Sequence, residues 1–313
     1  FSTPTRHPPI LSGLVGSEMC IRDRIWQANY VKSRLEKLGF ACTLVTLKSS
    51  GDQDLIQPLY SMGIQGIFTK TLDHALLNDS IDIAVHSLKD VPTLLPEGII
   101  ISAFLERGAV NDVMVYHKDF INWQKNTQIG TGSLRRRAQW LRKYPHHSTE
   151  NLRGNLQKRL NKLNAANWGG AIFAQAGLER LNLLRNKFTV LDWMIPAPGQ
   201  GIISVASLEK NKALTKFVQT LNCKETQLCA EVERTFLSEI EAGCTAPVGA
   251  YAHVKNDLMS FKCGLFSLEG SEAILHETQA KLSNTKELGL KTAMHVIEKG
   301  GSELMEKIKS QMR

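Results

Sequence analysis

Hydrophobic residues recur along most of this chain at two spacings. The first is helical: Ala28, Val31 and Leu35 fall on one face of a helix that opens near Trp26 and ends at Gly39. The second is a short apolar run bounded by polar or turn residues, which is typical of a buried strand. Such runs are predicted at 41–47, 81–85, 98–103, 113–116, 127–129 and 170–174, with helices near 68–77, 133–144, 155–163 and after 178. Strands that alternate with helices favour an α/β fold with largely parallel sheets.

The pattern changes after about residue 222. A long amphipathic helix is predicted over about 224–241. Three strand-like runs follow, at 247–254, 259–266 and 273–280, and the turn signals between them indicate an antiparallel meander. The last stretch, 285–312, is helical with a break at 300–301. Together with a change of pattern near 107–111, this predicts two boundaries in the chain.

The net charge of the chain limits the classes of partner that it is expected to bind. The 313 residues carry a formal net charge of +8, and nine basic residues but a single acid, Glu150, fall between 131 and 163. This favours an anionic partner, which could be nucleic acid, a membrane surface or an acidic small molecule. No recognised nucleic-acid-binding motif occurs, and no apolar run is long enough to span a bilayer. The six cysteines include no CxxC pair, which disfavours both a disulfide framework and a zinc site.

Polar clusters follow several of the predicted strands, where ligands bind in open α/β sheets. Lys89 and Asp90 follow one strand, and Arg135 and Arg136 open the helix that Ser133 caps. Arginine is poorly placed at a helix N-terminus unless negative charge compensates it, which suggests an anionic ligand. Three further basic residues repeat this layout: Arg153, Arg159 and Arg180. Each cluster alone fits an ordinary solvated face, but together they predict a site for several carboxylates or phosphates.

Six motifs, in their order and spacing, resemble the signature of the porphobilinogen deaminase (hydroxymethylbilane synthase) family. They are residues 82–92 (DIAVHSLKDVP), 130–136 (GTGSLRR), 152–155 (LRGN), 176–180 (AGLER), 196–201 (PAPGQG) and 241–249 (EAGCTAPVG). The similarity runs from about Trp26 to the C-terminus.

The resemblance implies a specific reaction. Enzymes of this family join four porphobilinogen units head to tail with release of ammonia, and then free the linear tetrapyrrole by hydrolysis, as a step of haem biosynthesis. They carry a dipyrromethane cofactor on a cysteine, which by motif is Cys244 here. The partners implied are porphobilinogen and the growing polypyrrole, with no nucleic acid, no membrane and no metal. The resemblance further implies a cytoplasmic monomer.

The resemblance also assigns roles to individual residues. It implies that Asp90 and Lys89 are catalytic, with the Asp90 carboxylate stabilising the cation that forms as ammonia leaves. The residues it implies for cofactor binding, besides Cys244, are Thr131, Ser133, Arg135, Arg136, Arg159, Gly177 and Gln200. Those implied for substrate binding are Gln27, Phe68, Arg153, Ala174 and Arg180.

The fold that the resemblance implies is α/β with three domains. Two lobes similar to periplasmic binding proteins would flank a crevice, and a small α+β domain would carry the cofactor cysteine. The expected division is 25–106 with 199–221 for the first domain, 107–198 for the second and 222–313 for the third.

The chain departs from the family pattern in two places. The family's first strand and its Arg-x-Ser should precede Trp26, but those two positions fall on Met19 and Ile21, which cannot bind a carboxylate. Residues 13–24 resemble a translated library adapter, so we expect 1–24 to be a non-native or disordered leader. In the glycine-rich loop, Ser61 and Gln65 stand where the family often has lysines.

Two alternatives stay open at this point. One is a two-lobed binding protein for anionic solutes, without catalysis, which would need no cysteine loop. The other is a deaminase crippled by its N-terminus.

Overall fold

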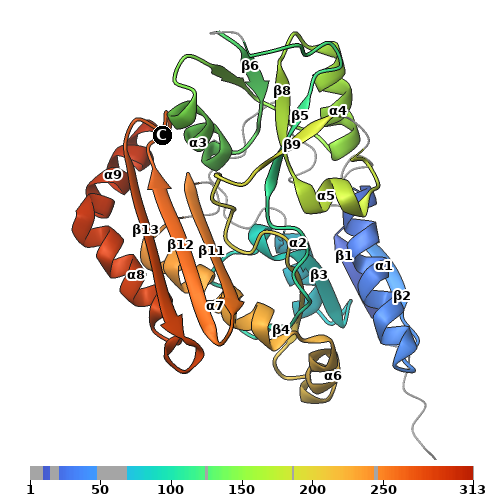
Figure 1. Ribbon diagram of the computed structural model, residues 1–313. Helices are drawn as coiled ribbons and strands as arrows, with labels where there is room; N and C mark the ends of the chain where they lie inside the picture. Colours follow the sequence, from blue (N-terminus) through green and yellow to red (C-terminus); the bar gives the residue numbers. More distant parts are fainter. Residues whose placement is uncertain are drawn as a thin grey trace, which may run out of the picture.

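The computed structural model describes residues 10–14, 21–47, 69–123, 126–184, 187–242 and 246–312. Within these ranges the chain forms three β-sheets, each with its own helices (Figure 1). Two mixed sheets build the two lobes, and an antiparallel sheet builds the C-terminal part. The α/β class predicted from the sequence is confirmed.

The first lobe is a five-stranded sheet in the order β2-β1-β3-β10-β4. Its strands are β1 (Ile10–Leu14), β2 (Thr43–Leu47), β3 (Ile83–Ser87), β4 (Ile99–Phe104) and β10 (Ile203–Leu208). Its helices are α1 (Ile21–Lys37), α2 (Lys70–Leu77) and α6 (Lys212–Val218). Val31 and Leu35 of α1 pack against β3 and β10, as the helical spacing predicts.

Part of the expected leader lies inside this lobe. Residues 10–14 form β1, which pairs in parallel with β2 on one side and β3 on the other. Helix α1 begins at Ile21, five residues before the predicted start at Trp26. Neither the strand at 10–14 nor the helical start at 21–25 was predicted, because a five-residue strand beside prolines leaves little periodicity to detect. The expectation that 1–24 is a non-native or disordered leader stays a prediction.

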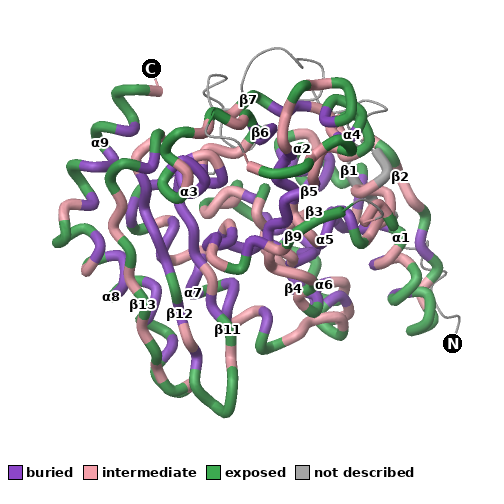
Figure 2. The backbone as a smooth tube through the Cα atoms, turned by 45° about the horizontal axis from the view of Figure 1, so that its top comes forward, coloured by how far each residue is buried: buried purple, intermediate pink, exposed green. Residues whose placement is uncertain are grey.

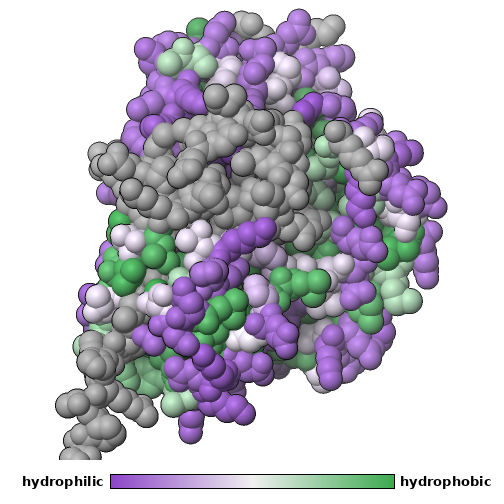
Figure 3. Space-filling model, turned by 180° about the vertical axis from the view of Figure 1, so that it is seen from behind, coloured by the Kyte–Doolittle hydropathy of each residue, from purple (hydrophilic) through white to green (hydrophobic). Residues whose placement is uncertain are grey.

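The second lobe repeats the layout of the first, in the order β7-β6-β8-β5-β9. Its strands are β5 (Asp112–Tyr116), β6 (Gln128–Gly130), β7 (Ser148–Glu150), β8 (Gly170–Ala174) and β9 (Phe188–Leu191). Its helices are α3 (Leu134–Lys143), α4 (Leu156–Ala165) and α5 (Gln175–Arg180). From behind, the surface of this lobe, at the top of Figure 3, is mainly hydrophilic.

The lobes have the largely parallel sheets expected from the sequence, with one strand of five in each running against the other four. Strand β10 runs antiparallel to β3 and β4, and β5 runs antiparallel to β8 and β9. Strand β5 is the first strand after the chain crosses into the second lobe, and β10 is the first after it returns to the first lobe. Each of these two strands therefore runs against its neighbours in the sheet. Strands β7, β9 and β10 and helix α6 were not predicted.

The two segments that cross between the lobes lie side by side. Leu105 N donates to Ile203 O at 2.9 Å, and Gly108 N donates to Gly201 O at 3.1 Å. Gly201 has a φ of +86°, and a Cβ there would lie 2.8 to 2.9 Å from the carbonyl oxygens of Ala109 and Gly108. Only glycine allows the two crossings to approach this closely.

The C-terminal part consists of a three-stranded antiparallel meander with helices on one face. The strands are β11 (Val248–Lys255), β12 (Leu258–Phe266) and β13 (Ala273–Lys281), and the helices are α7 (Lys224–Glu239), α8 (Leu288–Val296) and α9 (Ser302–Gln311). The predicted meander is confirmed, and the predicted break falls at Gly300, with φ +94°. Buried residues run densely along β12, β5 and β3 in Figure 2.

The strands of the three sheets come from 10–104 with 203–208, from 112–191, and from 248–281. On this grouping we propose the three-domain division expected from the sequence. None of the helices in the described ranges is both long and apolar enough to cross a membrane.

Candidate active site

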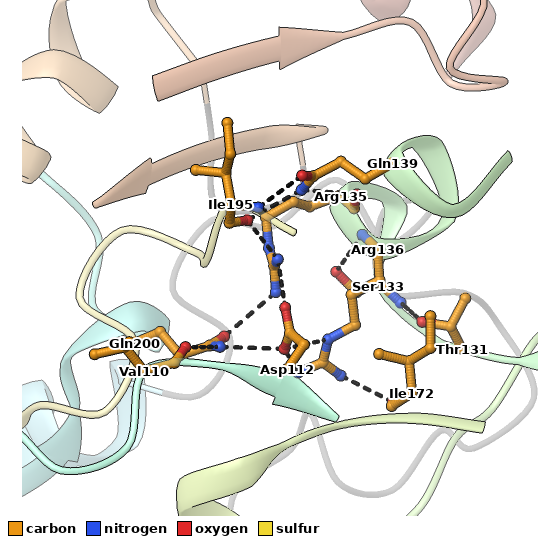
Figure 4. A network of polar contacts seen from close by, with 10 residues as sticks. All are labelled: Val110, Asp112, Thr131, Ser133, Arg135, Arg136, Gln139, Ile172, Ile195 and Gln200. Carbon is orange, nitrogen blue, oxygen red and sulfur yellow. Dashed lines mark hydrogen bonds and ion pairs between the residues drawn. The ribbon is translucent and has the colours of Figure 1, made fainter. Parts of the chain in front are cut away.

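A buried carboxylate, Asp112 at the start of β5, lies at the centre of the predicted anion site. Arg135 Nη1 lies 2.6 Å from its Oδ2, and Arg136 Nε and Nη2 lie 2.9 and 2.8 Å from its Oδ1. Gln200 Nε2 donates to the same Oδ1 at 3.1 Å. Figure 4 shows both guanidinium groups directed at this one carboxylate, with Gln200 approaching from the crossing segment. The structure thus brings three of the predicted cofactor-binding residues together around an acid that was not predicted.

The charges around Asp112 fix its ionisation. Burial alone would raise its pKa, but Arg135 and Arg136 bring the pKa of Asp112 down to about 2. The carboxylate is therefore charged at neutral pH. The sequence suggested that a ligand compensates the two first-turn arginines. Asp112 supplies one negative charge from within the protein, and compensation of the rest by a ligand stays a prediction.

The start of α3 positions both arginines. Ser133 is the N-cap and its side chain accepts a bond from Arg136 N at 3.5 Å, while Thr131 Oγ1 accepts one from Ser133 N at 3.3 Å. A Cβ on Gly132 would lie 2.6 Å from Leu152 O, so this loop requires glycine. Arg135 and Arg136 are left only 3% and 6% exposed, with Arg135 Nη1 also donating to Ile195 O at 2.7 Å.

Lys89 and Asp90 lie on the turn that follows β3, the 3-10 helix η3 (Leu88–Asp90). Asp90 is exposed and Lys89 is half-buried. Burial lowers the pKa of the Lys89 ammonium and Arg136 adds to this, while Asp90 and Asp112 act against it. These influences put Lys89 within electrostatic reach of both Asp90 and the Arg136–Asp112 pair.

The remaining basic residues occupy separate positions. Arg153 is buried just before α4, and Arg159 Nε donates back to Gly154 O at 2.7 Å. Arg180, at the end of α5, donates from Nη2 to Gly201 O at 3.1 Å, and its Cζ lies 5.7 Å from the centre of the Trp26 ring. Arg180 therefore joins the second lobe to a crossing segment and to α1.

The other predicted residues fall into two groups. Gln27 is 2% exposed, and its Nε2 lies 2.9 Å from Ser87 Oγ, at the end of β3. Ala174 and Gly177 lie at the start of α5, where a Cβ on Gly177 would lie 3.2 Å from Leu156 Cδ1, so that glycine serves close packing. Four residues named from the sequence, Met19, Ser61, Gln65 and Phe68, lie outside the described residues, as does Cys244.

A second buried ion pair, also missed from the sequence, joins the crossing segments to the C-terminal part. Arg107 Nη1 lies 2.6 Å from Glu233 Oε1 on α7, and Arg107 Nε donates to Gln200 O at 2.9 Å. Glu233 is fully buried and also accepts from Gly199 N at 2.7 Å and Ala252 N at 2.8 Å. A glutamate beside the apolar stripe of the predicted helix was the available signal.

Two of the cavities among the described residues are not lined by the predicted site residues. One, of about 800 Å³, lies between α1 and the start of α7 and includes Arg34 and Cys223. The other, of about 670 Å³, lies between α3 and the turn after β12. The described residues include no group of three or more His, Cys, Asp or Glu that could hold a metal ion.

Comparison with known proteins identifies the family. Residues 24–216 match the family model for the dipyromethane cofactor-binding domain of porphobilinogen deaminase, and residues 227–298 match the model for its C-terminal domain. This chain belongs to the porphobilinogen deaminase family. The family assignment covers both lobes and the part of the chain that carries Cys244.

Individual relatives agree with the family models. The porphobilinogen deaminase of Carboxydothermus hydrogenoformans is 37% identical over 292 residues, which cover 91% of this chain and 94% of that protein. The porphobilinogen deaminase of Francisella tularensis subsp. novicida is 38% identical over 287 residues, covering 90% and 95%.

Solved structures also show more distant likenesses. A Salmonella typhimurium periplasmic binding protein gives a TM-score of 0.37 at 12% identity, covering 70% of this chain and 94% of that one. A probable amino-acid transporter binding protein of Bacillus subtilis gives a TM-score of 0.39 at 12% identity, covering 69% and 90%. Scores this low add nothing to the assignment.

Proposed function

We propose that this chain is a hydroxymethylbilane synthase, a transferase that joins four porphobilinogen units head to tail and releases one ammonia for each. The observation that carries the proposal is the match of both family models, which together span the lobes and the C-terminal part. The buried arginine pair beside the Lys89–Asp90 turn supports it, because a polypyrrole is a polyanion.

The charge balance of the site suits this substrate. Arg135 and Arg136 contribute two positive charges and Asp112 removes one, which leaves a net charge of +1 before Lys89 is added. Each pyrrole brings an acetate and a propionate, so a growing chain needs cations along its length. In this proposal the cofactor carboxylates are bound by Thr131, Ser133, Arg135, Arg136, Arg159, Gly177 and Gln200, and the substrate is bound by Gln27, Phe68, Arg153, Ala174 and Arg180.

The donors around α3 fit a dipyrromethane, which carries two acetates and two propionates. Arg135 Nε is buried and has no hydrogen-bond partner in the described part of the chain, so the protein leaves donor capacity here unused. Thr131 and Ser133 add two hydroxyl groups in the loop and at the N-cap of the same helix. When bound, the dipyrromethane supplies the free pyrrole carbon at which chain growth starts.

Cys244 is the proposed attachment point. Three of the other cysteines, Cys42, Cys229 and Cys263, are buried, and burial raises the pKa of the Cys229 and Cys263 thiols to about 12. A thiol that is buried and protonated is a poor nucleophile. These three are therefore poor candidates for a thioether. Of the remaining cysteines, Cys20, Cys223 and Cys244, only Cys244 lies in one of the family motifs.

Asp90 is the proposed catalytic carboxylate. As the C–N bond of the substrate breaks and ammonia leaves, positive charge develops on the pyrrole ring and its methylene carbon. The exposed Asp90 carboxylate would stabilise this charge while a ring carbon of the growing chain bonds to the methylene carbon, and until that ring carbon releases its proton to water. Lys89, next to it, holds a substrate carboxylate.

We also propose a cellular location, an oligomeric state and a set of partners for the enzyme. The proposal places the protein in the cytoplasm as a monomer, with porphobilinogen and the polypyrrole as partners and no nucleic acid or membrane.

The intact mass of the purified protein tests the cofactor. Mass spectrometry should show an addition of two pyrrole units on Cys244, and Cys244→Ser should lack it. Asp90→Ala should keep the added mass but consume porphobilinogen at least about 100-fold more slowly, since it removes a preorganised charge opposite the developing cation. Turnover near the wild-type rate in Asp90→Ala would contradict the catalytic assignment.

The same measurements separate the alternatives. A solute-binding protein would carry no added mass and would leave porphobilinogen unchanged. A deaminase crippled by its N-terminus would carry the cofactor and turn over slowly even with Asp90 in place.

A further inference from the structure

One arginine of the C-terminal part hydrogen-bonds to the chain directly after the turn that carries Lys89 and Asp90. Arg234 lies on α7, and its Nη1 donates to Val91 O at 3.0 Å. Its Nη2 donates to Pro92 O at 2.6 Å and to Thr93 O at 3.3 Å. A single guanidinium thus binds the carbonyl groups of the three residues that directly follow Asp90.

The same turn is anchored from inside the first lobe. Leu88 N donates to Ile202 O at 3.0 Å, and Val91 N donates to Leu88 O at 3.0 Å. Leu88 and Val91 are buried in one cluster with Ala230 of α7. Lys89 and Asp90 are the members of the turn left outside this cluster, so their backbone position depends on what holds 88 and 91–93.

The backbone carbonyl groups of residues 91–93 accept hydrogen bonds from the Arg234 guanidinium, which suits the local backbone. Val91 has extended backbone angles, φ −87° and ψ 124°, as expected before a proline, and Pro92 has no N–H to offer a neighbouring strand. Arginine can serve all three, because its planar fork carries five N–H donors and it is never deprotonated in proteins. A lysine in the same place would offer a point charge instead.

Helix α7 leads from this contact toward the proposed cofactor cysteine. It ends at Glu239, and Cys244 follows Arg234 by ten positions in the sequence. In Figure 1, α7 runs between the C-terminal sheet and the first lobe, and it packs on β11 and β4. One helix is therefore joined both to the segment that carries Cys244 and to the turn that carries Asp90.

We propose that Arg234 is a positioning residue: it fixes the Lys89–Asp90 turn to the helix that precedes Cys244, and so sets the distance between the Asp90 carboxylate and the tethered chain. This inference rests on the proposed function for its catalytic meaning, while the structural contact stands by itself. Misplacement of a reacting group by about 1 Å can cost about 100-fold in rate.

The test compares Arg234→Gln and Arg234→Lys with a matched control. Arg142→Gln is the control, because Arg142 Nη1 also binds backbone carbonyls across a contact with the C-terminal part, Gly270 O at 3.3 Å and Ser271 O at 3.5 Å. Arg234→Gln should lower kcat about 10- to 100-fold with KM changed less than about 3-fold, since the carboxylate-binding arginines are untouched. Arg234→Lys should recover part of the loss, and Arg142→Gln should keep wild-type kcat and KM.

Hydrogen exchange supplies a readout that does not need activity. Amides of residues 88–94 should exchange faster in Arg234→Gln than in the wild type, while those of α3 stay unchanged. Intact mass should show that the variant still carries its cofactor. Wild-type exchange in 88–94, or a kcat equal to that of Arg142→Gln, would overturn the inference.

The two proposals fail in different ways. If the wild type carries no cofactor and consumes no porphobilinogen, the proposed function fails, and the exchange result alone decides the role of Arg234. If the wild type is active and Arg234→Gln matches it in rate and exchange, the positioning role fails alone.

Discussion

At the scale of single residues, Asp112 has the largest consequence for the site. It was not a candidate from the sequence, yet both first-turn arginines of α3 and Gln200 bind it. Buried arginines need a fixed counter-charge, because an isolated charge in the interior is costly. Asp112 therefore sets where the two guanidinium groups point, and how much positive charge is left for a ligand.

Replacement of Asp112 by asparagine should destabilise the protein strongly. The change keeps the shape of the side chain but leaves two buried guanidinium groups without their carboxylate, which costs about 3 to 5 kcal/mol. Denaturant unfolding measures this loss. Asp192→Asn, at an exposed position, is the control and should stay within about 0.5 kcal/mol of the wild type. Equal effects of the two substitutions would mean that the pairing around Asp112 contributes nothing to stability.

His86, the residue before Ser87 in β3, predicts a pH dependence of stability. Burial, with a smaller contribution from Arg24, lowers the pKa of His86 from 6.5 to about 4. As the pH falls, His86 therefore binds a proton in the unfolded chain before it does so in the folded chain. The contribution of neutral His86 to the free energy of unfolding is fully present above pH 6.5, and it is lost as the pH falls from 6.5 towards 4.

Unfolding measured at pH 7 and pH 5 should show about 2 kcal/mol less stability at the lower pH from this residue. His86→Gln cannot titrate and should remove that difference, whereas His146→Gln, at an exposed position, should keep it. A pH profile of His86→Gln that overlays the wild type would show that another group is responsible.

At the scale of elements, the sequence predicted what depends on neighbours along the chain. The bounds of the strand at 170–174 and of the helix capped by Ser133 were predicted to within one residue. The spacing of hydrophobic residues and the N-cap are both signals that lie in neighbouring residues of the chain. Strand β10 was missed although it is wholly buried, because Ser204 and Ser207 interrupt its apolar run. Its direction could not be predicted at all, since that depends on the chain returning from the second lobe.

The same reasoning explains which parts of the site were found. Arg135 and Arg136 were found because two arginines at a helix N-terminus break a local rule. Asp112 breaks no rule at the start of a strand, and its role appears only when β5 is placed beside α3. The pairing of Arg107 with Glu233, 126 positions apart, is likewise a property of the assembled fold.

Between the two crossing segments, Gly201 should tolerate no side chain. A Cβ there would meet two backbone oxygens at 2.8 and 2.9 Å, and its φ is +86°. Gly39 is a matched control, because its φ is +91° and nothing lies within 4 Å of an added Cβ. Gly39→Ala should cost about 1 to 2 kcal/mol for the left-handed backbone, and Gly201→Ala about 1 to 3 kcal/mol more for the clash. Denaturant unfolding compares them, and equal losses would mean that the crossings can separate at little cost.

At the scale of the whole molecule, one group of polar contacts that joins the parts of the fold centres on Glu233. Its carboxylate binds Arg107 and Gly199 N of the crossing segments and Ala252 N of β11. A fully buried glutamate thus contacts both crossings and the C-terminal sheet, and so links the C-terminal part to the segments that join the lobes.

The strength of this link can be measured with a double-mutant cycle of Arg107→Gln, Glu233→Gln and the double variant. Glu233→Gln alone should cost about 3 to 5 kcal/mol, because it strands a buried guanidinium, and the double variant should cost less than the sum of the two. The pair Lys210–Asp79 is the control: its 2.9 Å separation is similar to the 2.6 Å of Arg107–Glu233, but both of its side chains are 65% exposed. Exposed pairs couple by less than about 1 kcal/mol. If Arg107 and Glu233 couple no more strongly than Lys210 and Asp79, burial does not strengthen this contact.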